Sequence, residues 1–273
     1  VRLADIDRSV NDNGLQVFGT VTKDPVATGA ELVAYSGFSA SNYLEQPYNS
    51  DLDFGTGDFC FAYWTKRTNS TDSQQSFERA YYSGGYSGAA IRCTQGTSTH
   101  SFAISDDGLS TFDTVTSLAT SANNWVLFVF QRSGNTLEIY QNGELVDSTT
   151  ITNAAGSLSN ASATLVIGGN VQASDNLTQG DLSLFRISAT APTAAQIKKM
   201  YNDEKYLFQE NADATLYGSS DTVTALAYDD RTELLHAGTS AGRSVFQGLR
   251  RVDNTTDAVG ATISASNGLV ADD

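Results

Sequence analysis

The dipeptide Asn142-Gly143, set between two alternating runs, is the feature that most restricts what this chain can fold into. Residues 135–140 alternate polar and apolar side chains with period 2, and a second strand-like run follows at 144–148. Asn and Gly both tolerate positive φ, which a two-residue turn between antiparallel strands requires. The pattern therefore predicts a β-hairpin within an antiparallel sheet.

Strand patterns also occur on both sides of this hairpin. Residues 58–65 and 125–130 carry apolar side chains on both faces of a period-2 strand, which predicts a central position in a sheet covered on both sides. Shorter strands are predicted at 164–167 and 182–187. With 23 glycines and 3 prolines in 273 residues, the composition fits many short strands joined by turns.

One helix is predicted at residues 194–201. Thr193 and Gln196 have the spacing of a capping box, in which each side chain satisfies a backbone N–H of the other. Ile197, Met200 and Tyr201 share one face, which predicts that the helix packs against the edge of the strands.

The chain is thus predicted to be all-β, a two-sheet antiparallel jelly-roll sandwich with one short helix and β-rich terminal extensions. Residues 1–31 form a lead-in segment, 32–208 the jelly roll and 209–273 a C-terminal β-meander. The meander resembles one blade of a β-propeller, and a single blade cannot bury both of its faces alone.

The charge balance excludes several classes of partner. The formal net charge is −15, and the 16 lysines and arginines form no basic stripe. Nucleic acids and anionic membrane surfaces are bound through clustered cations, so neither is expected as a partner. No apolar run is long enough for a transmembrane helix, and membrane insertion is not expected.

Cys60 and Cys93 lie outside any CxxC pair, which argues against a zinc site. They could form one disulfide, but free and partly buried thiols are favoured.

The sequence contains no complete catalytic pattern. Glucanases of sandwich folds need a Glu-x-Asp-x-Glu strand, which places their carboxylates on one face, and the chain has no such triplet. Asp51 and Asp53 have the nearest spacing, and a role in the adjoining turn is favoured for them. His100 and His236 are each interpreted as packed structural residues. The prediction is a protein without enzymatic activity.

The best candidates for carbohydrate contact are aromatic. Tyr81, Tyr82 and Tyr86 cluster in one loop, where their rings could stack on sugars, and Asn170 and Asp175 could hold hydroxyl groups on another loop. The competing interpretations are a tyrosine-rich hairpin packed on the sandwich and ordinary turn residues.

No cofactor is expected, although Ca²⁺ is possible. Asp175 and Asn176 are the weak candidates for its oxygen ligands, and a role in the turn is favoured for both.

The order of motifs resembles a laminin-G-like jelly roll of the concanavalin A-like lectin/glucanase kind. The resemblance rests on the segment 52–59, the tryptophan-led strand at 125–129, the hairpin at 137–146, the closing strand at 180–187 and the helix start at 192–197. The closing strand carries Ser183-Leu184 where this family often has Asp-Glu, so any metal or catalytic role tied to those acids is in doubt here.

The flanks, at 7–10 and 13–19, resemble tail-fibre or other virion appendage proteins of marine bacteriophages. This resemblance implies a lectin-like adhesion or structural module on a virion surface, outside the cell. It would be a homo-oligomer or bind other virion proteins, and could contact a bacterial surface glycan. A purely structural assembly or decoration subunit is the alternative, and a glycoside hydrolase is disfavoured.

Overall fold

The computed structural model describes residues 2–3, 13–68, 73–108, 110–174, 177, 179–212, 216, 222–248 and 250–272. The chain divides into two compact units. The first comprises Val1–Asp24 with Ala34–Tyr201, and the second comprises Pro25–Val33 with Asn202–Asp273. Asp7 to Val10, part of the flank that resembles virion proteins, lies outside the described residues.

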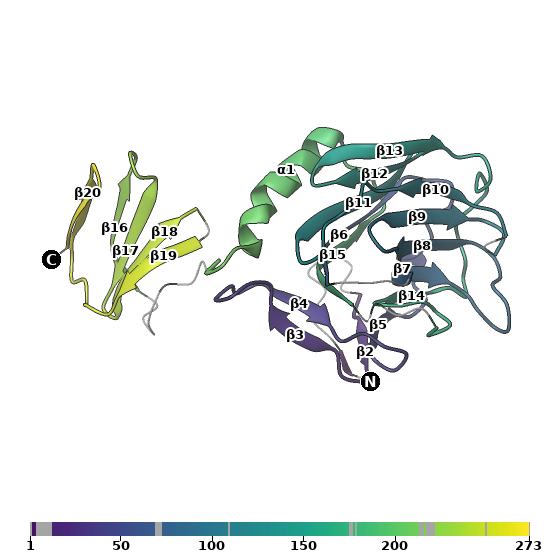
Figure 1. The fold of residues 1–273 in the computed structure, drawn as a ribbon, viewed down its shortest axis with the longest axis horizontal. Coiled ribbons are helices and arrows are strands. Elements are labelled where there is room, and N and C mark those ends of the chain that lie inside the picture. The colour runs from purple at the N-terminus through teal and green to yellow at the C-terminus, as the bar shows by residue number, and fades with distance from the viewer. Residues whose placement is uncertain are drawn as a thin grey trace. The chain divides into compact units, whose positions relative to one another are not determined.

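Two large sheets form the sandwich (Figure 1). One has eight strands in the order β1-β2-β5-β14-β7-β8-β9-β10, and the other has seven in the order β13-β12-β11-β6-β15-β4-β3. Their bounds are β1 (Arg2–Leu3), β2 (Gln16–Phe18), β3 (Thr22–Pro25), β4 (Val33–Ser36), β5 (Tyr43–Gln46), β6 (Phe59–Arg67), β7 (Gln74–Ala80), β8 (Ala90–Gln95), β9 (His100–Ser105), β10 (Asp113–Thr116), β11 (Trp125–Ser133), β12 (Thr136–Gln141), β13 (Glu144–Thr150), β14 (Thr164–Ile167) and β15 (Gly180–Ser188). This confirms the predicted all-β, two-sheet antiparallel sandwich.

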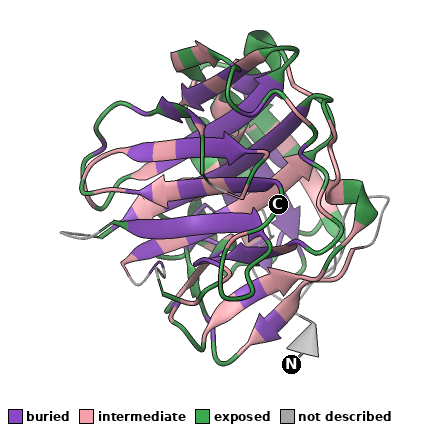
Figure 2. Cartoon of the chain, turned by 90° about the vertical axis from the view of Figure 1, so that its right-hand side faces the viewer, coloured by how far each residue is buried: buried purple, intermediate pink, exposed green. Residues whose placement is uncertain are grey.

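An aromatic core fills the space between the sheets. Phe61 of one sheet stacks on Phe77 of the other with ring centroids 4.9 Å apart, and Phe102 stacks on Phe130 at the same separation. All four side chains are fully buried, and each contributes roughly 1.5–3 kcal/mol by leaving water. Figure 2 shows that buried residues gather on the strands, whereas exposed residues lie mostly on the loops.

The outer face of β6 is buried as well, as its two apolar faces predicted. Trp64 on this face stacks against Tyr201 of the helix α1 (Ala194–Glu204), with ring centroids 5.8 Å apart. The α1 start is a capping box: the Thr193 N–H donates to Gln196 Oε1 at 2.8 Å, and the Gln196 N–H donates to Thr193 Oγ1 at 3.3 Å. A short 3₁₀ helix, η2 (Lys205–Phe208), follows α1.

The predicted turn between β12 and β13 is confirmed, because Asn142 and Gly143 both have positive φ, 53° and 84°. The turn also lies close against the helix α1. A Cβ on Gly143 would lie 3.0 Å from Lys198 Cδ and 3.1 Å from Tyr201 Cβ, so only glycine leaves room for the helix here. Cys60 and Cys93 are free and buried, as favoured from the sequence.

The second unit contains a four-stranded antiparallel meander, β16 (Val223–Asp229), β17 (Leu234–Thr239), β18 (Gly242–Gln247) and β19 (Arg250–Thr255). The first three strands lie where the sequence predicts the meander, and the hairpin β20 (Ile263–Ser266) and β21 (Leu269–Asp272) adds a separate small sheet. Val259 and Ile263 are buried against Gly238 of β17 and cover one face of the meander there. The boundaries at 31/32 and 208/209 stay a prediction.

Among the described helices, none has both the length and the apolar composition needed to cross a membrane.

Candidate functional site

Three strands of the eight-stranded sheet run in the same direction and terminate at the same end of the sandwich, which we call its tyrosine edge. β5 and β7 both pair antiparallel with β14, and β9 follows β7 in direction because β8 lies antiparallel between them. The loops that follow these strands, at 47–58, 81–89 and 106–112, therefore meet at one edge.

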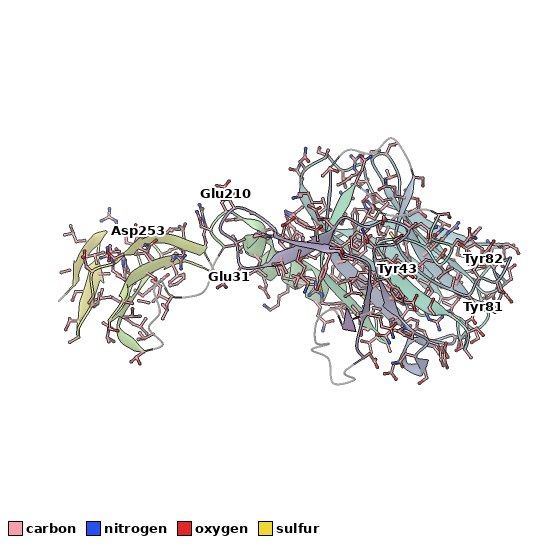
Figure 3. The ribbon with its side chains drawn as sticks, turned by 90° about the horizontal axis from the view of Figure 1, so that it is seen from below. Glu31, Tyr43, Tyr81, Tyr82, Glu210 and Asp253 are labelled. Atoms are coloured by element: carbon pink, nitrogen blue, oxygen red, sulfur yellow. The ribbon has the colours of Figure 1, made fainter. Side chains whose placement is uncertain are left out.

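Exposed tyrosines mark this edge. Tyr48 follows β5 and is 43% exposed, while Tyr81 and Tyr82 follow β7 and are each 39% exposed. Figure 3 shows Tyr81 and Tyr82 at one end of the sandwich, with Tyr43 nearer its middle. We call Tyr48, Tyr81 and Tyr82 the tyrosine rim. Rings that keep this much surface in water offer an apolar face together with a hydroxyl group, a combination common at binding surfaces.

Tyr86 differs from the rim because it folds back over the outer face of the sheet. Its hydroxyl group lies 3.1 Å from each carboxylate oxygen of Glu78, a β7 residue that is fully buried. Its ring meets that of Tyr82 edge-on, with centroids 5.3 Å apart. Tyr86 thus anchors the loop that carries Tyr81 and Tyr82.

A second loop reaches the same carboxylate from the opposite edge. It follows β14, whose end lies beside the start of β7, and it brings the Val171 N–H to Glu78 Oε2 at 3.0 Å. Within this loop Asn170 is buried, and its side chain accepts from the Ser174 N–H at 3.0 Å. We call the contact of Glu78 with Tyr86 and Val171 the Glu78 junction.

Asp53 holds the other side of the tyrosine-bearing loops. One carboxylate oxygen accepts from the Tyr48 hydroxyl group at 2.9 Å, and the other accepts from the Asn160 N–H at 2.8 Å and pairs with buried Arg79. Asn160 in turn donates to the carbonyl oxygen of Ser87 at 3.0 Å. Burial raises the pKa of Asp53, but the hydrogen bonds from Asn160 and Tyr48 and the charge of Arg79 outweigh it, so the pKa is lowered on balance.

Negative charge continues around the edge. The loop after β9 packs on the tyrosine loop, since a Cβ on Gly108 would lie 2.9 Å from the Tyr86 carbonyl oxygen. Hydrogen bonds from Ser105, Thr111 and Ser110 lower the pKa of Asp107, so this exposed carboxylate is ionised at neutral pH.

Glu45 and Glu78 share the outer face of the sheet, with β14 between their strands. Two strand spacings separate their backbones by about 10 Å. Burial raises the pKa of Glu45, as a catalytic acid would need. Glu78, however, is fully buried beneath the two loops that it joins, so a substrate does not reach it. The two glutamates therefore do not act as a catalytic pair in this arrangement.

The structure separates the predicted site residues into two groups. Tyr81 and Tyr82 are exposed at the rim, whereas Tyr86 is bonded to Glu78 and Asn170 is buried, one residue before Val171 of the Glu78 junction. Asp175 and Asn176 lie outside the described residues. Elsewhere in the described part of the chain, no group of three or more His, Cys, Asp or Glu side chains is placed to hold a metal ion.

Sequence reasoning missed three residues of this edge: Tyr48, Glu78 and the pairing role of Asp53. Asp53 has a structural role, as favoured, but the role is an ion pair with Arg79 and not only a turn. Tyr48 and Glu78 carry no local signal in the sequence, because the pairing of β5 and β7 with β14 is what places their segments at the same end of the sheet.

A family model described as the Concanavalin A-like lectin/glucanases superfamily matches residues 38–198. No curated protein matches the sequence.

Solved structures with a similar fold include binding domains of botulinum neurotoxins. The domain of neurotoxin DC in complex with rat synaptotagmin II has 13% identity and a TM-score of 0.57, over 92% of this chain and 60% of that one. The same domain in complex with SialylT gives 13% and 0.57, over 94% and 61%. The serotype G domain gives 11% and 0.59, over 98% and 62%. This chain therefore spans about three fifths of these neighbours, and at such identities the likeness is one of fold.

Proposed function

This chain belongs to the concanavalin A-like lectin/glucanases superfamily, and we propose that it is a non-enzymatic, lectin-like module that holds a glycan on its tyrosine rim. The observation that carries the proposal is the exposure of Tyr48, Tyr81 and Tyr82 on loops that hydrogen bonds to Asp53 and Glu78 hold in place. A rim whose loops are already ordered loses little conformational entropy on binding. Two of the structural neighbours were solved in complex with SialylT and with synaptotagmin II, which supports a glycan or a protein as the class of partner.

A glycan array followed by calorimetry tests the proposal. The double variant Tyr81→Ala/Tyr82→Ala should weaken binding of the best glycan by at least about tenfold, the loss typical of removing central aromatic contacts. Leu118→Ala is the matched control, since Leu118 is 60% exposed on the loop that follows β10 at the opposite edge. If no glycan on the array binds, or if the control weakens binding as much as the double variant, the lectin proposal fails.

We further propose that the module is carried on the surface of a bacteriophage particle, on a tail fibre or similar appendage, and meets a bacterial surface glycan there. The resemblance of residues 7–10 and 13–19 to virion appendage proteins supports this placement. Immunogold labelling of purified virions with an antibody against the sandwich is the test. If virions whose genome encodes this protein remain unlabelled, the assignment fails.

The alternative is a structural subunit that assembles with copies of itself or with other virion proteins. One observation favours it: Leu226 and Tyr228 are 62% and 59% exposed on the same face of the edge strand β16. Exposed apolar residues on an edge strand are typical of surfaces that pair with another chain. Light scattering coupled to gel filtration tests this: an oligomer that Leu226→Asp dissociates would support assembly, and a monomer at all concentrations would contradict it.

A further inference from the structure

We infer that the tyrosine rim selects uncharged glycans and discriminates against acidic ones, an inference that rests on the proposed function. The uncharged ligand would be a pyranose that presents its apolar face to Tyr81 and Tyr82. The argument comes from the charges that surround the rim.

Acidic side chains lie on two loops of the tyrosine edge, those at 47–58 and 106–112. The loops of this edge, at 47–58, 81–89, 106–112, 134–135 and 151–163, contain no lysine or arginine. Their acidic residues are Asp51, Asp53, Asp58, Asp106 and Asp107. A bound carboxylate or sulfate group would therefore meet like charges from more than one loop.

The arginines on the adjoining strands do not offset this charge at the surface. Arg79 has 1% of its side chain exposed and is paired with Asp53. Arg132 is buried, and its Nε donates to the Gly134 carbonyl oxygen at 3.1 Å. The half-buried Arg92 lies over the Phe112 ring, 4.5 Å from its centroid, on the strand beside β7, where its backbone is opposite Glu78.

Asp107 stays negative well into acidic conditions, because hydrogen bonds from Ser105, Thr111 and Ser110 lower its pKa. Asp53 is ionised as well, but its ion pair with Arg79 cancels most of its charge, so the repulsion comes from the other acidic side chains of these loops. The repulsion is therefore present wherever the folded protein is studied near neutral pH. Asp51 is fully at the surface and accepts from the Asn13 side chain at 3.1 Å, which makes it the simplest charge to remove.

The test compares two forms of one biantennary N-glycan, ending either in galactose or in sialic acid. Binding of both forms to the full chain is measured by calorimetry in about 0.02 M and about 0.5 M NaCl. The galactose-terminated form should bind at least about tenfold more tightly at low salt, and the ratio should shrink at high salt, where the screening length falls to a few ångströms. Asp51→Lys should shrink the ratio at low salt by improving the sialylated form, with little change for the neutral form. Asp51→Asn controls for the side chain itself and should have a smaller effect in the same direction.

The outcomes separate this inference from the proposed function. Equal or tighter binding of the sialylated form at low salt, particularly if Arg92→Gln abolishes it, would overturn the preference for uncharged glycans while leaving a lectin in place. If neither form binds and the array is also blank, the lectin proposal itself fails. A ratio that favours the neutral form but does not respond to salt or to Asp51→Lys would also contradict the electrostatic argument.

Discussion

Among single side chains, Glu78 has the most consequences for the candidate site. It is fully buried in β7, yet it accepts hydrogen bonds from Tyr86, eight residues away along the chain, and from Val171, 93 residues away. A buried carboxyl group is costly unless it is hydrogen-bonded, so these contacts stabilise Glu78 while Glu78 fixes the loops that provide them. The exposed tyrosines of the rim can be substituted without leaving a buried polar group unpaired.

Tyr86→Phe should therefore destabilise the protein although it removes a single oxygen atom. The change leaves a buried carboxyl group without one of its hydrogen-bond partners, and the free energy of unfolding should fall by about 1–3 kcal/mol. Urea denaturation followed by fluorescence measures it. Tyr82→Phe is the control: Tyr82 is exposed, and this change should stay within about 0.5 kcal/mol of the wild type. Equal effects of the two changes would contradict the role assigned to Glu78.

His100 should make stability depend on pH. Burial, assisted by the charge of Arg67, lowers the pKa of its imidazole from 6.5 to about 3. As pH falls below 6.5 the unfolded chain takes up a proton that the folded chain refuses, so the free energy of unfolding should decrease by roughly 1.4 kcal/mol for each pH unit between those limits. His100→Gln can still bond to Gln95, the partner of His100 Nε2, and should flatten the dependence between pH 6 and pH 4.5. Urea midpoints over this range measure it, and an unchanged slope in the variant would assign the effect to other groups.

Local sequence patterns predicted individual strands and the helix, but they could not show which of these elements lie side by side. The alternation around Asn142-Gly143 and the capping box at Thr193 were readable because each depends on residues a few positions apart. The meeting of Tyr86 and Val171 over Glu78 was not readable, since it depends on β14 lying beside β7. The tyrosine cluster was found by its composition, but the sequence could not show that Tyr86 is an anchor and that Tyr48 belongs to the rim.

The contact of the hairpin β12–β13 with helix α1 gives a prediction for Gly143. Gly143→Ala places a methyl group against Lys198 and Tyr201 at a position with φ of 84°, whereas Gly134→Ala, with φ of 58°, meets no other atom within 4 Å. Both changes strain the backbone, but only the first displaces the helix, so Gly143→Ala should cost about 1–3 kcal/mol more. Thermal denaturation of the two variants compares them. Equal losses would mean that the close approach of α1 does not matter for stability.

Over the full chain, the net charge of −15 dominates long-range behaviour. At neutral pH it repels copies of the protein and polyanions alike, which agrees with the expectation of no nucleic-acid partner. As pH approaches the isoelectric point near 4.3, this repulsion disappears.

Solubility should therefore pass through a minimum near pH 4.3, and static light scattering against pH measures it. At neutral pH the second virial coefficient should be positive and should fall as salt is added. A negative coefficient at pH 7 and low salt would show that specific self-association outweighs the charge, as the assembly alternative requires.

The separation of an anchored base from an exposed tip has a consequence for how this surface can diversify. The turn that joins Tyr82 to Tyr86 includes Gly84 and Gly85, where an added Cβ would meet no described atom within 4 Å. Gly84 has a φ of 73° and would be kept, but libraries at the other positions of 81–85, with Glu78 and Tyr86 also kept, would leave the hydrogen bonds of the Glu78 junction in place. The sandwich is thus suited to acquire new ligand preferences by drift or by directed evolution at little cost to its fold.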